Sequence, residues 1–322
     1  LDEALFLDND RFRQARARAL DEYRRAPFRP PALAGQSYPA DPAELRGLLD
    51  GLLAAAGPVA PAPDARGLLS PHIDYPRGGA VYAKAWKRVQ PAVQAAELVV
   101  LLGTDHYSDT AASLTLTRQS YATPFGVLPT DTAVVDALAE AVGPGAAFAG
   151  ELRHRGEHSL ELVAVWLHHL RGGEPVALVP VLTGSFARCV EQGVSPLSDP
   201  ALAALVEALR TATAGRRVFW LASGDLAHVG PAFNGPPLDR AARAALQQAD
   251  LDVITRLCAG DAEGFYTAIQ RVGDRNNVCG LSPAYLTLKA LGAAEGECVA
   301  YASCPADEAG ASAVTICGVV WE

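Results

Sequence analysis

Histidines follow three of the apolar, strand-like runs in this chain, each a few residues past the end of its run. These residues are His72, His106 and His228. The carboxyl ends of parallel strands share one edge of an open α/β sheet, and ligands bind in the crevice at that edge. The chain has only seven histidines. Delivery of three imidazoles to one edge therefore predicts a metal site.

Two further residues bring chemistry to the same edge. Cys279 precedes Gly280 and a helix start at Ser282, so we expect its sulfur near a helix N-terminus. The positive end of the helix dipole favours the thiolate, which is the form that binds metal or attacks a substrate. Asp225, three residues before His228, adds a carboxylate that can orient a ligand or become one.

The other histidines have simpler explanations. Glu157 and His158 open a helix, and an acidic first turn is what a helix prefers. His168 and His169 fall in the last turn of that helix, where imidazole suits the negative end of the dipole. We assign no chemistry to these residues or to His154.

Strand-like and helical runs alternate along the chain, which predicts one α/β domain with a mostly parallel sheet covered by helices on both faces. We expect strands at 67–70, 97–102, 112–117, 176–182, 217–222, 298–303 and 313–321. We expect one helix that starts at Asp41-Pro42 and ends at Gly57, with an apolar stripe over 45–53. Further helices are expected at 79–89, 131–142, 159–171, 199–213, 237–257, 261–271 and 283–292, several of them opened by caps at Asp131, Asp199 and Ser282. We expect the last of these runs, at the C-terminal end of the chain, to be an antiparallel edge strand.

Residues 1–33 are expected to form a helical arm and linker, and residues 34–322 the α/β domain. Asp8 or Asp10 can cap the arm's helix, which runs to about Arg25 before a proline-rich stretch.

Composition narrows the class of protein. The 322 residues carry a formal charge of −9, which argues against a nucleic-acid partner. The six cysteines form no CxxC pair, and no apolar run reaches the ~20 residues of a membrane span. We therefore expect a reducing, cytoplasmic location and no membrane partner.

Six ordered motifs give the chain a family resemblance that runs from about Ala34 to the C-terminus. They resemble motifs of Memo-family proteins, which include component B of the bacterial AmmeMemoRadiSam system; a seventh segment, Ala34–Asp41, is similar to the family's opening motif. The six are Pro71-His72-Ile73-Asp74-Tyr75, Gly103-Thr104-Asp105-His106, Thr123-Pro124-Phe125-Gly126, Glu157-His158-Ser159, Ser223-Gly224-Asp225-Leu226-Ala227-His228 and Val278-Cys279-Gly280.

The resemblance implies a fold like that of the class III extradiol dioxygenases and a redox-metal site. It implies His72, His106 and Cys279 as ligands of iron or copper, with Asp225 and His228 lining the same pocket as catalytic groups. Radical-SAM and AMMECR-type proteins are the partners that the resemblance implies. A phosphopeptide-binding adaptor role is associated with the animal branch.

The chain departs from the family pattern next to the first two histidines. Asp74 places a carboxylate near His72, Asp105 stands where serine is typical, and Tyr107 stands where a second histidine is common. The departures leave the ligand set intact but bear on the choice of substrate and metal.

A soft thiolate favours Cu(I), Fe or Zn. If Cys279 stays outside the first coordination sphere, then Asp225, Asp105 or Asp74 can complete a two-histidine, one-carboxylate triad suited to Fe(II) and O₂.

These observations favour an iron- or copper-dependent oxidoreductase, dioxygenase- or oxidase-like, that acts on a small organic substrate. His228 and Asp225 would move protons. One alternative is a zinc-dependent hydrolase with Asp225 or Glu157 as the base. The other is a non-catalytic module that binds a peptide or phosphopeptide, with Arg77 or Arg275 available to a phosphate.

Overall fold

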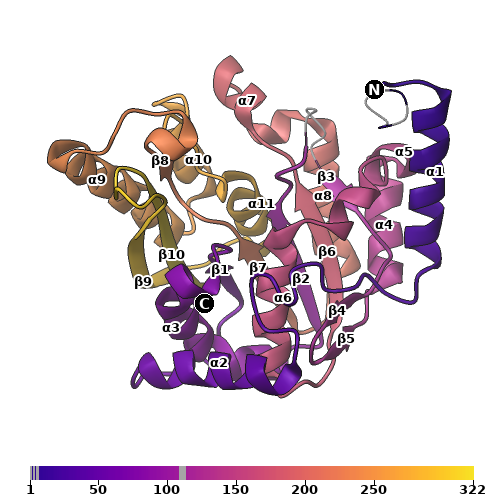
Figure 1. Ribbon diagram of the computed structural model, residues 1–322, viewed down its shortest axis with the longest axis horizontal. Coiled ribbons are helices and arrows are strands. Elements are labelled where there is room, and N and C mark those ends of the chain that lie inside the picture. Colours follow the sequence, from indigo (N-terminus) through magenta and orange to yellow (C-terminus); the bar gives the residue numbers. More distant parts are fainter. Residues whose placement is uncertain (1, 3, 5–6, 109–113) are drawn as a thin grey trace.

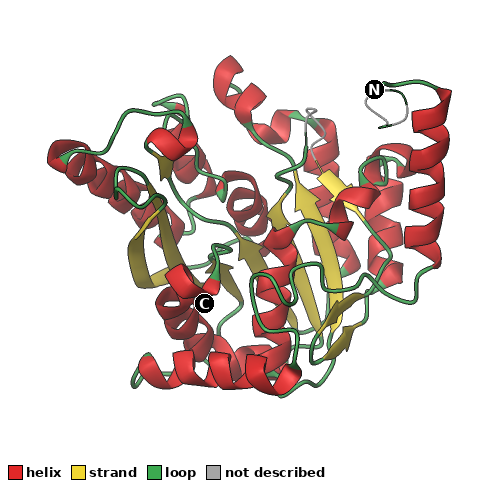
Figure 2. Ribbon diagram, in the orientation of Figure 1, coloured by secondary structure: helices red, strands yellow, loops and turns green. Residues whose placement is uncertain are grey.

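An open, mixed β-sheet with helices on both faces forms the centre of the protein (Figures 1 and 2). The computed structural model describes residues 2, 4, 7–108 and 114–322. Within them the sheet has eight strands in the order β3-β6-β2-β7-β1-β10-β8, with β9 paired to β10. The strands are β1 (Gly67–Ser70), β2 (Leu98–Thr104), β3 (Leu114–Leu116), β6 (Ala177–Thr183), β7 (Val218–Ser223), β8 (His228–Val229), β9 (Gly296–Pro305) and β10 (Ala313–Trp321).

The four central strands, β6, β2, β7 and β1, run parallel to one another. Their carboxyl ends therefore meet at one edge of the sheet, as the sequence predicted. The outer strands β3, β10, β9 and β8 pair antiparallel to their neighbours. A separate hairpin of β4 (Tyr121–Thr123) and β5 (Gly126–Leu128) was not predicted.

The β2 strand shows why the sheet is covered on both sides. Its residues are apolar without interruption from Leu98 to Leu102, and all of them are buried. Leu98, Val100 and Leu102 pack into one hydrophobic core, whereas Val99 and Leu101 pack into another. Successive side chains of a strand point to opposite faces, so a continuous apolar run needs cover on each.

Different helices supply the two covers. The first core receives α4 (Thr132–Val142), α8 (Pro200–Ala212), α9 (Arg240–Cys258), α10 (Ala262–Gln270) and α11 (Leu281–Leu291). The second receives α2 (Pro42–Ala55), α3 (Tyr75–Ala95) and α6 (His158–Leu170). Shorter elements are α5 (Pro144–Ala147), α7 (Ala187–Gln192) and the 3₁₀ turns η1 (Glu151–Arg155), η2 (Pro196–Ser198) and η3 (Pro231–Phe233).

The N-terminal helix α1 (Asp10–Arg25) lies along the outside of the domain beside α5 (Figure 1), and it contacts η1. Arg24 pairs with the buried Glu151 at 2.6 Å. The chain after α1 then crosses the face of the sheet that the second core covers, which we call the second face, and Arg29 is fully buried there. This segment is therefore packed on the domain.

Three local predictions need correction. The closing strand β10 is antiparallel but internal, because it pairs with β9 along one side and with β1 and β8 along the other. Asn9, rather than Asp8 or Asp10, caps α1. The cap of α11 is the backbone of Gly280, and the hydroxyl of Ser282 instead contacts that of Thr183 at 2.9 Å.

The caps expected at Asp41, Asp131 and Asp199 are confirmed, since each carboxylate accepts a backbone N–H of its helix. Residues 112 and 113 of the predicted strand 112–117 lie outside the described residues.

In the described part of the chain, no single helix has the length and apolar character to cross a membrane. One pair of segments, Thr132–Val142 and Pro144–Arg155, has that length and apolar character only when the two are taken together, and they are bent by 119° where they join.

Candidate metal centre

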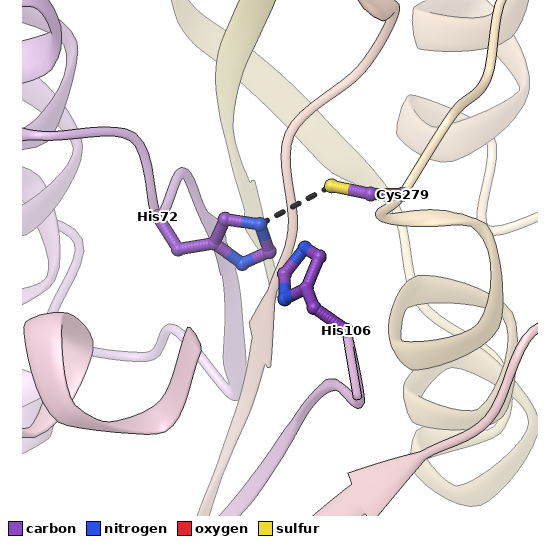
Figure 3. Close-up of side chains that lie close together, drawn as sticks. All are labelled: His72, His106 and Cys279. Atoms are coloured by element: carbon purple, nitrogen blue, oxygen red, sulfur yellow. Dashed lines mark hydrogen bonds between the residues drawn. The ribbon is translucent and has the colours of Figure 1, made fainter. Parts of the chain in front are cut away.

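His72 lies in the turn after β1 and is buried. Its Nδ1 is 3.2 Å from the hydroxyl of Ser223, at the end of β7. That hydroxyl donates to the carbonyl of Ser159 at 2.5 Å, so it accepts the Nδ1 proton of His72. The Nε2 atom is left with its lone pair and lies 3.2 Å from the sulfur of Cys279 (Figure 3).

Burial lowers the pKa of His72 well below its usual value, and the neighbouring imidazoles of His106 and His158 lower it further. The ring is therefore neutral, which is the form that binds a metal.

His106 lies just after β2 and is held by a buried carboxylate. Glu157 accepts both the backbone N–H of His106, at 2.8 Å, and its Nδ1, at 3.0 Å. This contact fixes the proton on Nδ1 and leaves Nε2 as the atom available for a metal. A carboxylate behind a histidine in this way is a recurrent feature of protein metal sites.

The same carboxylate also holds His158, whose Nδ1 lies 3.0 Å from Glu157 Oε1. The ring of His158 stacks on that of His106 with 4.5 Å between centroids. Burial alone would raise the pKa of Glu157, but the hydrogen bonds from the two histidines outweigh it and hold the pKa far below its usual range. Glu157 is therefore a permanently ionised support for both rings.

Cys279 brings a thiol to these imidazoles from the turn before α11. Its carbonyl accepts the hydroxyl proton of Thr104 at 2.7 Å, and its sulfur lies 3.3 Å from the backbone N of Asp225. The candidate ligand atoms of Cys279, His72 and His106 all lie within 4.8 Å of one another. Burial raises the pKa of the Cys279 thiol well above its usual value. Burial therefore opposes the effect that we expected from the helix N-terminus.

Asp225 and His228 lie at the same site, next to Cys279. Oδ1 of Asp225 accepts the backbone N–H groups of His72, at 2.8 Å, and Ile73, at 3.3 Å. Oδ2 lies 3.9 Å from Nε2 of His72. Asp225 and His228 also form a group with Cys279 whose ligand atoms lie within 4.8 Å of one another.

His228 is oriented by backbone carbonyls. Its Nδ1 lies 3.1 Å from the carbonyl of Asn277 and 3.3 Å from that of Leu226. The proton therefore sits on Nδ1, and Nε2 is the free acceptor. Burial lowers the pKa of His228, whereas burial raises that of Asp225.

His72, His106, His158, Asp225 and His228 line a cavity of about 550 Å³. Its other lining residues include Tyr107, which is exposed, and Leu33 and Ser37 from the segment that crosses the second face.

The two other acidic candidates are already engaged. Asp74 caps α3 and pairs with Arg77, and Asp105 pairs with Arg153 at 3.0 Å. Of the three carboxylates considered as ligands, only Asp225 joins a group of candidate metal ligands in the described residues.

His158 and the bridging role of Glu157 are the site features that sequence reasoning missed. Glu157 does cap its helix, since it accepts the N–H of Ser159 at 3.0 Å. In the sequence, this helix cap alone was enough to account for the Glu157-His158 motif. The remaining histidines lie elsewhere: His154 contacts Tyr121, His168 contacts Thr123 and His169 contacts Asp50.

The donor set fits a first-row transition metal. Two imidazoles present Nε2, each with its other nitrogen fixed by a hydrogen bond, and a thiol converges with them. Such nitrogen and sulfur donors suit copper, iron or zinc rather than magnesium or calcium. Fold and site together define an α/β protein with a candidate metal centre at the carboxyl edge of a parallel sheet.

The chain belongs to the Memo family. The family model described as Memo-like protein matches residues 29–320. A MEMO1 family protein of Methanopyrus kandleri is 30% identical over 85% of this chain and 92% of its own length. One from Thermus thermophilus is 33% identical over 73% of this chain and 65% of its own length. A memo-1 homolog of Caenorhabditis elegans is 26% identical over 80% of this chain and 69% of its own length.

Proposed function

We propose that this protein is a metal-dependent redox enzyme that holds iron or copper at His72, His106 and Cys279 and acts on a small organic substrate. The observation that carries the proposal is the convergence of these three ligand atoms within 4.8 Å, beside a cavity that His72 and His106 line. Three protein ligands leave coordination positions open for a substrate or for O₂, as in other catalytic sites.

The chain's own residues have separable tasks in this scheme. Ser223 and Glu157 fix the rings of His72 and His106 so that each offers Nε2. When bound, iron or copper would supply one-electron chemistry. His228, with Nε2 free, is placed to accept a proton from a substrate hydroxyl, and the buried Asp225 beside it favours the charged imidazolium.

The test is O₂ consumption by protein reconstituted with iron or copper, over a panel of catechols and other small phenols. We expect uptake that requires both substrate and metal and that is lost in His106→Ala. His168→Ala, a histidine outside the cavity, is the matched control and should retain it. Zinc-dependent hydrolysis of ester or amide probes without O₂ uptake would favour the hydrolase. A protein that binds none of the three metals would favour the adaptor.

Two wider proposals rest on the family and on composition. We place the reaction in the cytoplasm, because the six cysteines are free thiols. We also propose radical-SAM and AMMECR-type proteins as partners, by analogy with the system after which part of the family is named. Co-purification from the native host tests the partner proposal.

A further inference from the structure

A second cavity adjoins the candidate metal centre. It measures about 350 Å³, and its wall is formed by β8, the loop 230–238, the first turns of α9 and the segment 275–277. Most of its lining side chains are apolar, among them Val229, Phe233, Leu238, Ala242 and Leu246. Cavities of roughly 300–1,000 Å³ with mostly apolar walls are typical of small-molecule sites.

The two cavities share a boundary. His228 and Phe233 line both of them, and their rings meet edge to face with 5.2 Å between centroids. The metal-centre cavity and this apolar space therefore meet at His228 and Phe233. This boundary is formed by the same imidazole that we assign to proton transfer.

The second cavity is built into the fold. Its loop is tied to the turn before β10, since the N–H of Leu238 donates to the carbonyl of Ala311 at 2.9 Å and that of Ala232 to the hydroxyl of Ser312 at 2.9 Å. Gly230 adopts φ +104°, and a Cβ there would lie 2.5 Å from the Cα of Ser312. This close approach fixes the loop, so the cavity is preformed and needs little ordering to receive a ligand.

We propose that the substrate is amphipathic, with a polar head that binds at the metal centre and an apolar side chain that occupies the cavity behind His228. The position of the substrate's polar head rests on the proposed function, and the position of its apolar side chain rests on the second cavity. Burial of each methylene is expected to strengthen binding about fourfold.

The experiment uses alkyl hydroxamates, which chelate metals through two oxygens, in a series from acetohydroxamate to octanohydroxamate. Affinity for the metal-loaded protein should rise about fourfold per methylene. Ala242→Phe, which fills the cavity, should flatten this dependence while acetohydroxamate still binds as in the wild type. Ala244→Phe, exposed on the same helix and outside the lining, is the matched control and should keep the slope.

A measurement without metal separates the two hypotheses. Saturation-transfer NMR with 1-hexanol and metal-stripped protein should show binding that Ala242→Phe abolishes and Ala244→Phe retains. Hydroxamates that fail to bind, beside hexanol that behaves as predicted, would overturn the metal function and support the apolar subsite. Equal slopes in the wild type and Ala242→Phe, or hexanol binding that ignores Ala242→Phe, would overturn the subsite.

Discussion

The buried ion pair between Arg29 and Glu161 gives a sharp prediction about stability. Both side chains are inaccessible to solvent. Glu161 also accepts the backbone N–H groups of Ala32 and Leu33, at 2.9 and 2.8 Å, and the hydroxyl proton of Tyr38. The pair therefore fastens the segment that contributes Leu33 and Ser37 to the metal-centre cavity.

Arg29→Met should destabilise the protein by about 3–5 kcal/mol, because it leaves the Glu161 carboxylate buried without its cation. It also removes the guanidinium's bonds to the carbonyls of His154, at 2.7 Å, and Glu157, at 3.1 Å. The double variant Arg29→Met/Glu161→Gln removes the uncompensated charge. It should regain at least about 1 kcal/mol relative to the single variant.

Urea unfolding followed by tryptophan fluorescence measures both free energies. The reasoning fails if Arg29→Met costs less than about 1 kcal/mol, or if the double variant is less stable than Arg29→Met. Either result would mean that the buried carboxylate is not the origin of the loss.

Two further predictions concern the metal centre and the pH dependence of stability. Glu157→Gln should weaken metal binding about 10–100-fold, because an amide cannot hold both His106 and His158 as the carboxylate does. The control Glu151→Gln changes a buried glutamate outside the site and should bind metal as the wild type does in the same titration. Equal affinities in the two variants would contradict the supporting role of Glu157. Burial raises the pKa of Asp274 to about 6, so the folded state holds a proton that the unfolded state has lost, and stability falls as the pH rises from about 4 to about 6. Asp274→Asn keeps an acceptor for the N–H of Val278 and should be more stable than the wild type by about 1–2 kcal/mol at pH 8 but not at pH 3.5; equal unfolding curves at pH 8 would refute this.

The strand-end histidines show which part of the site can be predicted from the sequence. His72 and His106 each follow a short apolar run, and parallel pairing of β1, β7 and β2 brings them to one edge. That step needs only the alternation of strands and helices and the geometry of parallel sheets. It was therefore predictable without knowledge of any contact.

The rest of the site depends on contacts between residues distant in sequence. Glu157 reads locally as a helix cap, and its contact with His106 spans 51 residues. The internal position of β10 likewise depends on its pairing with β1, far earlier in the chain. The charge of Cys279 depends on how deeply the turn before α11 is buried, which the neighbouring residues do not determine.

Metal analysis of protein purified anaerobically, without a histidine tag, tests the central claim most directly. We expect about one equivalent of iron or copper in the wild type, and its loss in both His72→Ala and Cys279→Ala. The control His168→Ala should keep the metal. Full metal content in the two ligand variants, or none in the wild type after reconstitution, would contradict the assignment of His72, His106 and Cys279 as the metal centre.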